Sequence, residues 1–151
     1  MKHIQSLLET FKTYGYEPEY YVVVTDHDDP LTAWSQEVAN LRGRTAFIIP
    51  PVLAFHPGRI YRVVRERLAT HHCLLGIVYI PGGTMAEHAE SVYVVIADVR
   101  SPSQQPDASV PIIRASDTTS VHVSMRDFQY WGYNFSFNCY YHREVTAQRT
   151  A

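Results

Sequence analysis

The stretch from Arg42 to Arg100 constrains the fold of this 151-residue chain more than any other, because strand, helix, strand and strand patterns follow one another in it without interruption. Three apolar runs, Arg44 to Ile49, Cys73 to Ile80 and Ser91 to Val99, end in proline or other turn residues and predict strands. A strand, a helix and a strand in this order imply a right-handed parallel crossover, with the third strand joining at an edge of the sheet. The predicted fold class is therefore α/β.

The helix of this unit is expected from Arg59 to Leu68, with Gly58 at its start. Its apolar side is predicted to consist of Ile60, Val63, Val64, Arg67 and Leu68, and its solvated side of Arg59, Arg62, Arg65 and Glu66. In a nucleic-acid-binding protein, Arg59, Arg62 and Arg65 would be candidate phosphate contacts. A solvated helix face, on which the arginines pair with Glu66, is the alternative interpretation.

The residues before this unit predict a helix, a strand and a second helix. His3 to Thr13 has apolar residues at helical spacing, and we expect this amphipathic helix to cover a sheet edge. A β-branched strand from Tyr20 to Thr25 follows. Leu31 to Leu41 is predicted to be the next helix, capped by Asp29 or Thr32.

Acidic residues follow the first strand, at the end where open α/β sheets place their ligands. Asp26, Asp28 and Asp29 are candidate ligands for a hard cation such as magnesium, which would support phosphoester hydrolysis by a hydrolase or nuclease. The alternative is that acidic residues before a proline and a helix serve as turn and N-cap residues.

The chain past Arg100 changes in character. Residues 101–109 contain two prolines and no large apolar side chain, which predicts an exposed loop. Val110 to Arg114 and Ser120 to Met125 predict two short strands. The aromatic segment from Tyr130 to Tyr141 is expected to pack against the sheet, and residues 145–151 are expected to form a frayed tail.

Composition agrees with a single domain spanning residues 1–151, because 46% of the residues are hydrophobic and can bury a core. A formal net charge of -2 provides no global attraction to the phosphate backbone of nucleic acids. The two cysteines lack the spacing of a zinc site or a disulfide framework. The chain has no signal-like segment and no run long enough to span a bilayer, so we expect it in the cytoplasm, without a membrane partner.

Several short motifs follow one another along the chain. They are Gly43-Arg44, Ile49-Pro50, Val64-Arg65 with Leu68, Ile80-Pro81-Gly82, and the run from Val92 to Ile96. In order and approximate spacing they resemble the C-terminal half of the N-6 adenine DNA methyltransferases, most closely the modification subunit of type I restriction-modification systems. Trp131 to Ser136, followed by Tyr140-Tyr141, resembles the segment that closes the family's catalytic domain. The resemblance implies a partial Rossmann-like, methyltransferase-like mixed sheet with flanking helices.

The features that carry chemistry in that family are missing. The family holds S-adenosylmethionine on a glycine-rich loop and the target base on an Asn-Pro-Pro-aromatic tetrad. The chain has neither motif, and only Pro30 stands where the tetrad would follow its strand. We therefore expect no catalytic residues, no cofactor-binding residues and no bound S-adenosylmethionine, with magnesium only under the metal-dependent alternative.

The resemblance implies a truncated, catalytically silent relative of bacterial type. Such a protein would act by binding or regulation, in the setting of restriction-modification or mobile-element DNA. The expected partners are DNA or a restriction-modification subunit, and a second copy of the chain could join through an exposed sheet edge. A metal-dependent hydrolase using Asp26, Asp28 and Asp29 is the alternative, and a folded remnant without specific activity is a third possibility.

Overall fold

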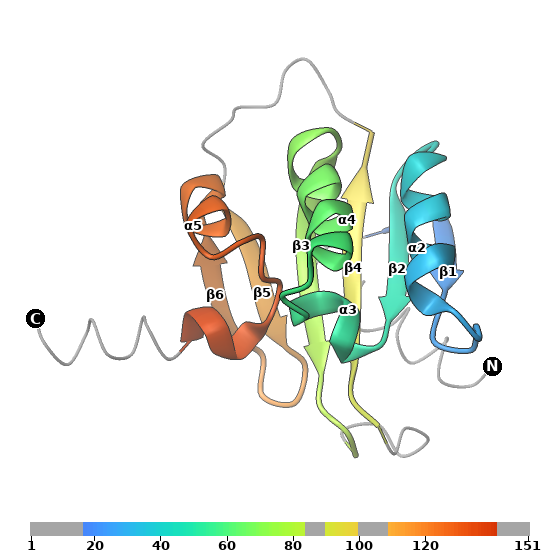
Figure 1. Cartoon of the computed structure of the whole chain (residues 1–151). Helices are drawn as coiled ribbons and strands as arrows, with labels where there is room; N and C mark the ends of the chain where they lie inside the picture. Colours follow the sequence, from blue (N-terminus) through green and yellow to red (C-terminus); the bar gives the residue numbers. More distant parts are fainter. Residues whose placement is uncertain (1–16, 84–89, 100–108, 142–151) are drawn as a thin grey trace, which may run out of the picture.

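The computed structural model describes residues 17–83, 90–99 and 109–141 of the chain. Figure 1 shows one six-stranded sheet with the strand order β1-β2-β4-β3-β5-β6. The strands are β1 (Tyr20–Val23), β2 (Thr45–Ile49), β3 (Cys73–Ile80), β4 (Val92–Asp98), β5 (Val110–Arg114) and β6 (Thr119–Val123). The helices are α2 (Pro30–Ala39), α3 (Pro51–Phe55), α4 (Arg59–Thr70) and α5 (Met125–Tyr130). Residues 137–141 are also helical.

The sheet is mixed and has flanking helices, which confirms the predicted α/β fold class. β1 and β2 are parallel, β3 and β5 are parallel, and β4 is antiparallel to both of its neighbours, β2 and β3. β2 and β3 therefore run in the same direction, as expected for strands joined by a helical crossover. β5 and β6 form an antiparallel hairpin at one side of the sheet.

The position of β4 corrects one expectation. The sequence predicted that this strand would join at an edge of the sheet, whereas it lies between β2 and β3. The connection that leads to β4 begins with a turn at Gly83, whose φ is 82°. The returning strand pairs with β3 from Ile80 opposite Val92 onward, and β2 pairs with its other edge. Residues 92–97 are consequently all buried.

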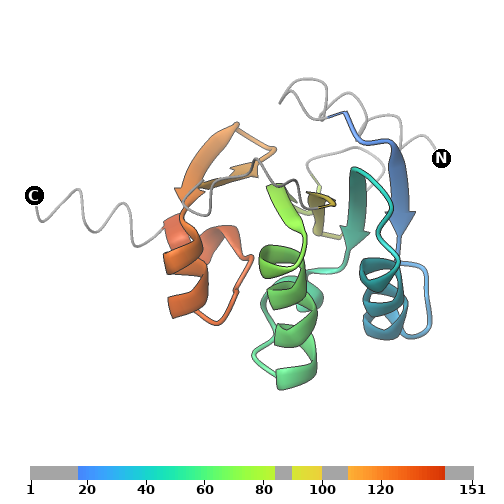
Figure 2. The same ribbon diagram turned by 90° about the horizontal axis from the view of Figure 1, so that it is seen from above.

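Two hydrophobic layers lie on opposite faces of the sheet. The larger layer contains side chains from every described helix, including Trp34, Leu68 and Phe128. Figure 2 shows α2, α3, α4 and α5 together on this one face. The smaller layer consists of sheet residues such as Val94, whereas the neighbouring Val95 belongs to the larger layer. This alternation explains why β4 is apolar along almost its whole length.

α4 faces the sheet differently from the sequence expectation. Val64, Arg65 and Leu68 are buried, whereas Ile60 is 69% exposed and Val63 is 41% exposed. The prediction of Ile60 and Val63 on the apolar side was wrong, and so was the assignment of Arg65 to the solvated side. The physical reason is that Arg65 donates three hydrogen bonds on the inner face of the helix, which fixes the helix rotation.

Helix starts follow ordinary capping chemistry. α2 begins after Asp29, whose side chain accepts a hydrogen bond from the backbone of Thr32, so the predicted cap is confirmed. Two short helices were not predicted. α3 has Pro51 at its first position, and α5 is capped by Ser124, whose hydroxyl accepts a hydrogen bond from the backbone of Asp127.

Three expectations fall wholly or mostly outside the described residues. They concern the amphipathic helix from His3 to Thr13, the loop 101–109 and the tail 145–151. Of the loop, Ser109 alone is described, and it is exposed. None of the helices in the described part has the length and hydropathy that a bilayer crossing requires.

Candidate functional site

The acidic turn after β1 lies at the carboxyl end of a parallel strand. Asp26, Asp28 and Asp29 are all exposed there. The Asp29 carboxylate accepts hydrogen bonds from the backbone N–H of Thr32 at 3.2 Å and from the Thr32 hydroxyl at 2.6 Å. These hydrogen bonds hold the pKa of the Asp29 carboxyl below its usual value. The carboxylate of Asp29 is therefore engaged in starting α2.

The described part of this turn does not assemble a metal-binding group. Across residues 17–83, 90–99 and 109–141, no three histidine, cysteine, aspartate or glutamate side chains are grouped so that they could hold a metal ion. The metal-dependent reading of Asp26, Asp28 and Asp29 gains no support from the structure. Turn and N-cap chemistry accounts for Asp29 directly.

Arg65 is a buried cation, with 2% of the residue exposed. Its guanidinium donates three hydrogen bonds to backbone carbonyl oxygens. Nε reaches Tyr133 at 2.7 Å, Nη1 reaches Leu53 at 3.0 Å and Nη2 reaches His56 at 2.8 Å. The acceptors belong to α3, to the residue that ends α3 and to the segment after α5. One side chain of α4 thus joins three parts of the chain.

The turn that ends α5 positions the carbonyl group of Tyr133. Gly132 and Tyr133 have φ values of 66° and 56°. Their N–H groups donate hydrogen bonds to the carbonyls of Gln129 at 3.3 Å and Phe128 at 2.7 Å, a common way for a helix to end. Glycine adopts this left-handed region freely, whereas a tyrosine is strained there. The hydrogen bond from Arg65 is one of the contacts that hold Tyr133 in place.

Burial lowers the pKa of the Arg65 guanidinium to about 10, with Tyr140 acting to raise it and Arg62 to lower it further. The group is still protonated at neutral pH. Because the guanidinium is buried and each of its three nitrogens donates to a backbone carbonyl oxygen, Arg65 cannot contact a phosphate group. This corrects its inclusion among the nucleic-acid contacts. Arg59 and Arg62 are exposed and remain candidate phosphate contacts.

Exposed apolar residues gather on α3 and α4, next to these two arginines. Four of the seven large exposed hydrophobic residues of the described chain are Val52, Phe55, Ile60 and Val63. Within each helix the two residues are three positions apart and therefore lie on one side. We call the region formed by Val52, Phe55, Arg59, Ile60, Arg62, Val63 and Glu66 the α3–α4 surface.

A cavity of about 280 Å³ lies at the amino ends of β1 and β2. Tyr20 of β1, Glu37 of α2 and Asn40, the residue that follows α2, form part of its wall. The Arg42 guanidinium lies 5.1 Å from the centre of the Tyr20 ring, so this cation is already stacked on an aromatic face. The cavity is at the opposite end of the strands from the place where α/β sheets bind their ligands.

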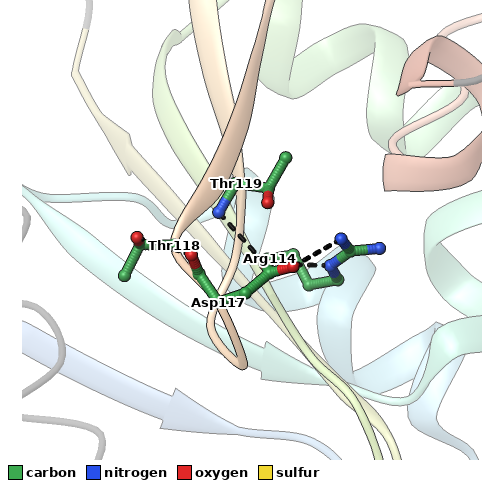
Figure 3. A network of polar contacts seen from close by, with 4 residues as sticks. All are labelled: Arg114, Asp117, Thr118 and Thr119. Carbon is green, nitrogen blue, oxygen red and sulfur yellow. Dashed lines mark hydrogen bonds and ion pairs between the residues drawn. The ribbon is translucent and has the colours of Figure 1, made fainter. Parts of the chain in front are cut away.

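A polar network closes the turn between β5 and β6 (Figure 3). The Asp117 carboxylate accepts hydrogen bonds from Arg114 Nε at 3.1 Å, from Arg114 Nη2 at 2.6 Å and from the backbone N–H of Thr119 at 3.1 Å. These bonds hold the pKa of the Asp117 carboxyl well below its usual range. The Arg114 guanidinium also lies 4.9 Å from the ring centre of Phe137. The network therefore ties the hairpin to the helical segment 137–141.

The aromatic segment packs against the sheet, as the sequence predicted. Phe135 and Phe137 are fully buried, and the Phe137 N–H donates a hydrogen bond to the Tyr93 hydroxyl at 3.2 Å. Tyr93 in turn stacks on Tyr79, with ring centres 4.8 Å apart. Burial raises the pKa of Tyr93. Tyr130 is an exception, because 76% of it is exposed.

Sequence reasoning missed the contacts of Arg65 and the short helix α3. Pro50-Pro51 followed by apolar residues was a usable signal for α3, because proline is favoured at the first helical position. For Arg65 the signal was weaker. Arg65 lies between the apolar residues Val64 and Leu68, and its charge was the only reason to assign it to the solvated side.

No protein-family model matches the chain, and no curated protein matches it in sequence. Among solved structures, a chain of a type I R-M system is similar, with a TM-score of 0.57 and 13% identity, over 70% of this chain and 31% of that one. The type I restriction-modification methyltransferase subunit from Streptococcus thermophilus has a TM-score of 0.49 and 14% identity, over 62% and 25% of the two chains. The M protein of the type I restriction enzyme EcoKI has a TM-score of 0.48 and 15% identity, over 68% and 27%.

The chain thus spans less than a third of the length of each of these structures. At such low identity, the similarity to the first of them shows a shared fold and not a shared activity. The mixed sheet and its helices therefore form an α/β fold similar to that of a chain of a type I R-M system.

Proposed function

We propose that this chain is a catalytically silent relative of the N-6 adenine DNA methyltransferases that acts by binding or regulation. Its setting is restriction-modification or mobile-element DNA, and its partner is DNA or a restriction-modification subunit. The similarity of its sheet to a chain of a type I R-M system is the observation that carries the proposal. We place this function in the cytoplasm, a location with which the reduced thiols of Cys73 and Cys139 agree.

The turn after β1 supports catalytic silence. Transfer of a methyl group to adenine needs the target amino group to be held by hydrogen bonds while an aromatic ring stacks on the base. The turn Asp26-His27-Asp28-Asp29-Pro30 offers neither an asparagine amide nor a large aromatic ring. Its last carboxylate is engaged by Thr32 at the start of α2.

Two features support a binding role. Arg59 and Arg62 are exposed on one helix and provide a local positive charge for phosphate groups, although the formal net charge is -2. β1 is the outermost of the described strands at its side of the sheet. A second polypeptide could pair along that edge.

Isothermal titration calorimetry tests catalytic silence. We expect S-adenosylmethionine and magnesium to give no saturable binding heat, and a methyl-transfer assay on duplex DNA to give no product. Saturable binding of S-adenosylmethionine together with methyl transfer would contradict the proposal. Binding of magnesium together with release of nucleotides from DNA would favour the hydrolase alternative instead.

A gel-shift assay at increasing salt concentration tests the DNA arm. Phosphate contacts release counterions, so binding should weaken steeply as salt rises, and Arg59→Gln should reduce the salt slope by about one unit. Arg126→Gln is the matched control, because Arg126 is an exposed arginine on α5. Equal effects of the two substitutions would argue against an interface at α4.

A further inference from the structure

We infer that the second face of the sheet, the one away from the described helices, is a docking surface for the chain's own N-terminal segment, residues 3–13. This face carries the smaller hydrophobic layer, in which each buried side chain is at most 5% exposed. The buried members are Ala46, Ile48, Val78, Ile80, Val92, Val94 and Ile96. Their burial requires a cover, and the chain itself offers one segment that fits.

No described helix contributes to this layer. Its buried members come from β2, β3 and β4, and the residues packed at its margin are Tyr21, Val23, Leu75 and Ala115, which also belong to strands or directly follow one. α2, α3, α4 and α5 all lie on the opposite face (Figure 2). A side chain on an uncovered sheet face points into water and stays accessible to it. Exposures of 0 to 5% therefore mean that another part of the protein lies over this face.

The cover belongs to the same chain. The exposures are those of a single chain, so neither a second copy nor a partner contributes to them. The cover therefore comes from the ranges outside the described residues, which are 1–16, 84–89, 100–108 and 142–151. Residues 100–108 contain no large apolar side chain, and 84–89 and 142–151 contain one each, Met85 and Val145. Residues 1–16 are the one range of the four with several such side chains.

The pattern and length of the N-terminal segment fit the layer. Ile4, Leu7, Leu8 and Phe11 follow one another at the spacing that forms a single apolar stripe on a helix. A helix over residues 3–13 would be about 16 Å long. The four strands β1, β2, β4 and β3, at a spacing of about 4.8 Å, span about 14 Å. The stripe is therefore long enough to cross the layer.

The connection to the sheet is short. The segment ends a few residues before β1, and Tyr21 and Val23 of β1 already lie at the margin of the layer. The α3–α4 surface does not take up the segment, because Ile60 remains 69% exposed in the same chain. The segment thus lies over a face of the sheet, whereas the sequence had led us to expect it at a sheet edge. A partner of the chain would have to bind elsewhere.

Nuclear magnetic resonance of the full wild-type chain, with labelled methyl groups, tests the position of the segment. We expect nuclear Overhauser cross-peaks between the methyl groups of Leu8 and Val94. Val95 is the matched control, because it is the next residue of β4 and belongs to the opposite layer. Cross-peaks from Leu8 to Val95 or Ile60, or none to Val94, would overturn the inference. Cross-peaks to Val94 that arise only between differently labelled copies would also overturn it, because a second copy would then supply the cover.

Urea unfolding tests the apolar stripe. Leu8→Asp places a charge against the layer, so the midpoint of unfolding should fall by roughly 1 to 2 M. Ser6→Asp is the matched control, because position 6 lies on the opposite side of the helix and the same residue is introduced. It should shift the midpoint by less than about 0.3 M. Equal midpoints for the two variants would contradict a buried Leu8.

A double-mutant cycle tests the contact between the segment and the face. The effects of Leu8→Ala and Val94→Ala on the urea midpoint should not add, because the two side chains touch, whereas those of Leu8→Ala and Val95→Ala should add. Additive effects with Val94, or coupling to Val95 instead, would overturn the inference. The cross-peaks are measured on the wild type, so they decide the question even where a substitution prevents folding.

Discussion

Arg65→Met replaces the buried guanidinium by an apolar side chain of similar length. In the wild type, Arg65 donates to the carbonyl oxygens of Tyr133, Leu53 and His56 at 2.7, 3.0 and 2.8 Å. The substitution removes all three donors. The hydrogen bonds to Tyr133 and Leu53 are buried, so water cannot readily replace them, whereas the one to His56 is partly buried. The variant should therefore unfold more easily than the wild type.

The size of this effect follows from two opposing contributions. Three hydrogen bonds from a charged donor contribute about 1.5 to 3 kcal/mol each, or roughly 4 to 9 kcal/mol together. Burial lowers the pKa of Arg65 to about 10, which corresponds to about 3 kcal/mol against the charged side chain in the folded state. Arg65→Met should therefore lower the free energy of unfolding by about 3 kcal/mol, within a range of roughly 1 to 6 kcal/mol.

Urea unfolding followed by circular dichroism and by tryptophan fluorescence measures the change. Arg62→Met is the matched control, because Arg62 is an exposed arginine of the same helix and its replacement should change the free energy of unfolding by less than about 0.5 kcal/mol. Arg65→Lys keeps a charge but cannot reproduce the planar fork that spans three carbonyl groups. It should lower the free energy of unfolding by about 2 kcal/mol. Equal midpoints for Arg65→Met and Arg62→Met would refute the reasoning.

The pH dependence provides a second check. Because the pKa of Arg65 is lowered to about 10, the unfolded state binds more protons than the folded state from about that pH upward. The contribution of this group to stability therefore rises with pH in that window and is constant below it. The difference between wild type and Arg65→Met should be equal at about pH 6 and about pH 8. A difference that changes between these two values would contradict a permanently charged Arg65.

Three other perturbations follow from local geometry. Asp117 has a lowered pKa, so its pairing with Arg114 stabilises the fold above the unfolded carboxyl pKa of about 4 and loses this effect on further acidification. The melting temperatures of wild type and Asp117→Asn should therefore converge at low pH, and a constant gap would contradict this. Burial lowers the pKa of His72, so the free energy of unfolding should fall as the pH drops below about 6.5, and His72→Gln should remove this dependence. A His72 pKa of about 6.5 or higher, measured by nuclear magnetic resonance, would refute the prediction. Gly132→Ala places a Cβ in open space at a φ of 66°, so backbone strain alone should lower the free energy of unfolding by about 1 kcal/mol in a urea titration.

The strands were predictable because their own residues carry the signal. β3 and β5 begin and end at the predicted residues, and β2 begins one residue later than expected. Each is an apolar run closed by residues that end a strand. α2 was predictable for a similar reason, because Asp29, Pro30 and an apolar face with Trp34 and Val38 are local features.

The arrangement of these elements was less accessible, because it depends on contacts between distant residues. An apolar run has the same local pattern whether it joins at an edge or enters between two strands, so the place of β4 could not be deduced from it. The burial of Arg65 depends on the carbonyl group of Tyr133, which lies 68 positions away in the chain. No helical pattern in residues 59–70 contains that information.

In the candidate site too, local roles could be predicted from the sequence, whereas roles that depend on distant contacts could not. Asp29 was open to a metal-binding and a capping interpretation, and the local sequence already contained Thr32, the partner that makes it a cap. The exposed Arg59 and Arg62 remain candidate contacts because nothing in the described fold draws them inward. Arg65 was misassigned because its three acceptors are backbone groups, which leave no trace in side-chain chemistry.

The exposure of Ile60 and Val63 follows from the way Arg65 is satisfied, and not from loose packing of α4. Turning the helix by about 100°, the angle between neighbouring residues, would bring the apolar pair toward the core. Burial of the two side chains would contribute roughly 3 to 6 kcal/mol. The same rotation would break hydrogen bonds of Arg65 that contribute roughly 4 to 9 kcal/mol and would leave buried carbonyl groups without donors. The observed rotation is therefore the more stable one, and it leaves Ile60 and Val63 exposed.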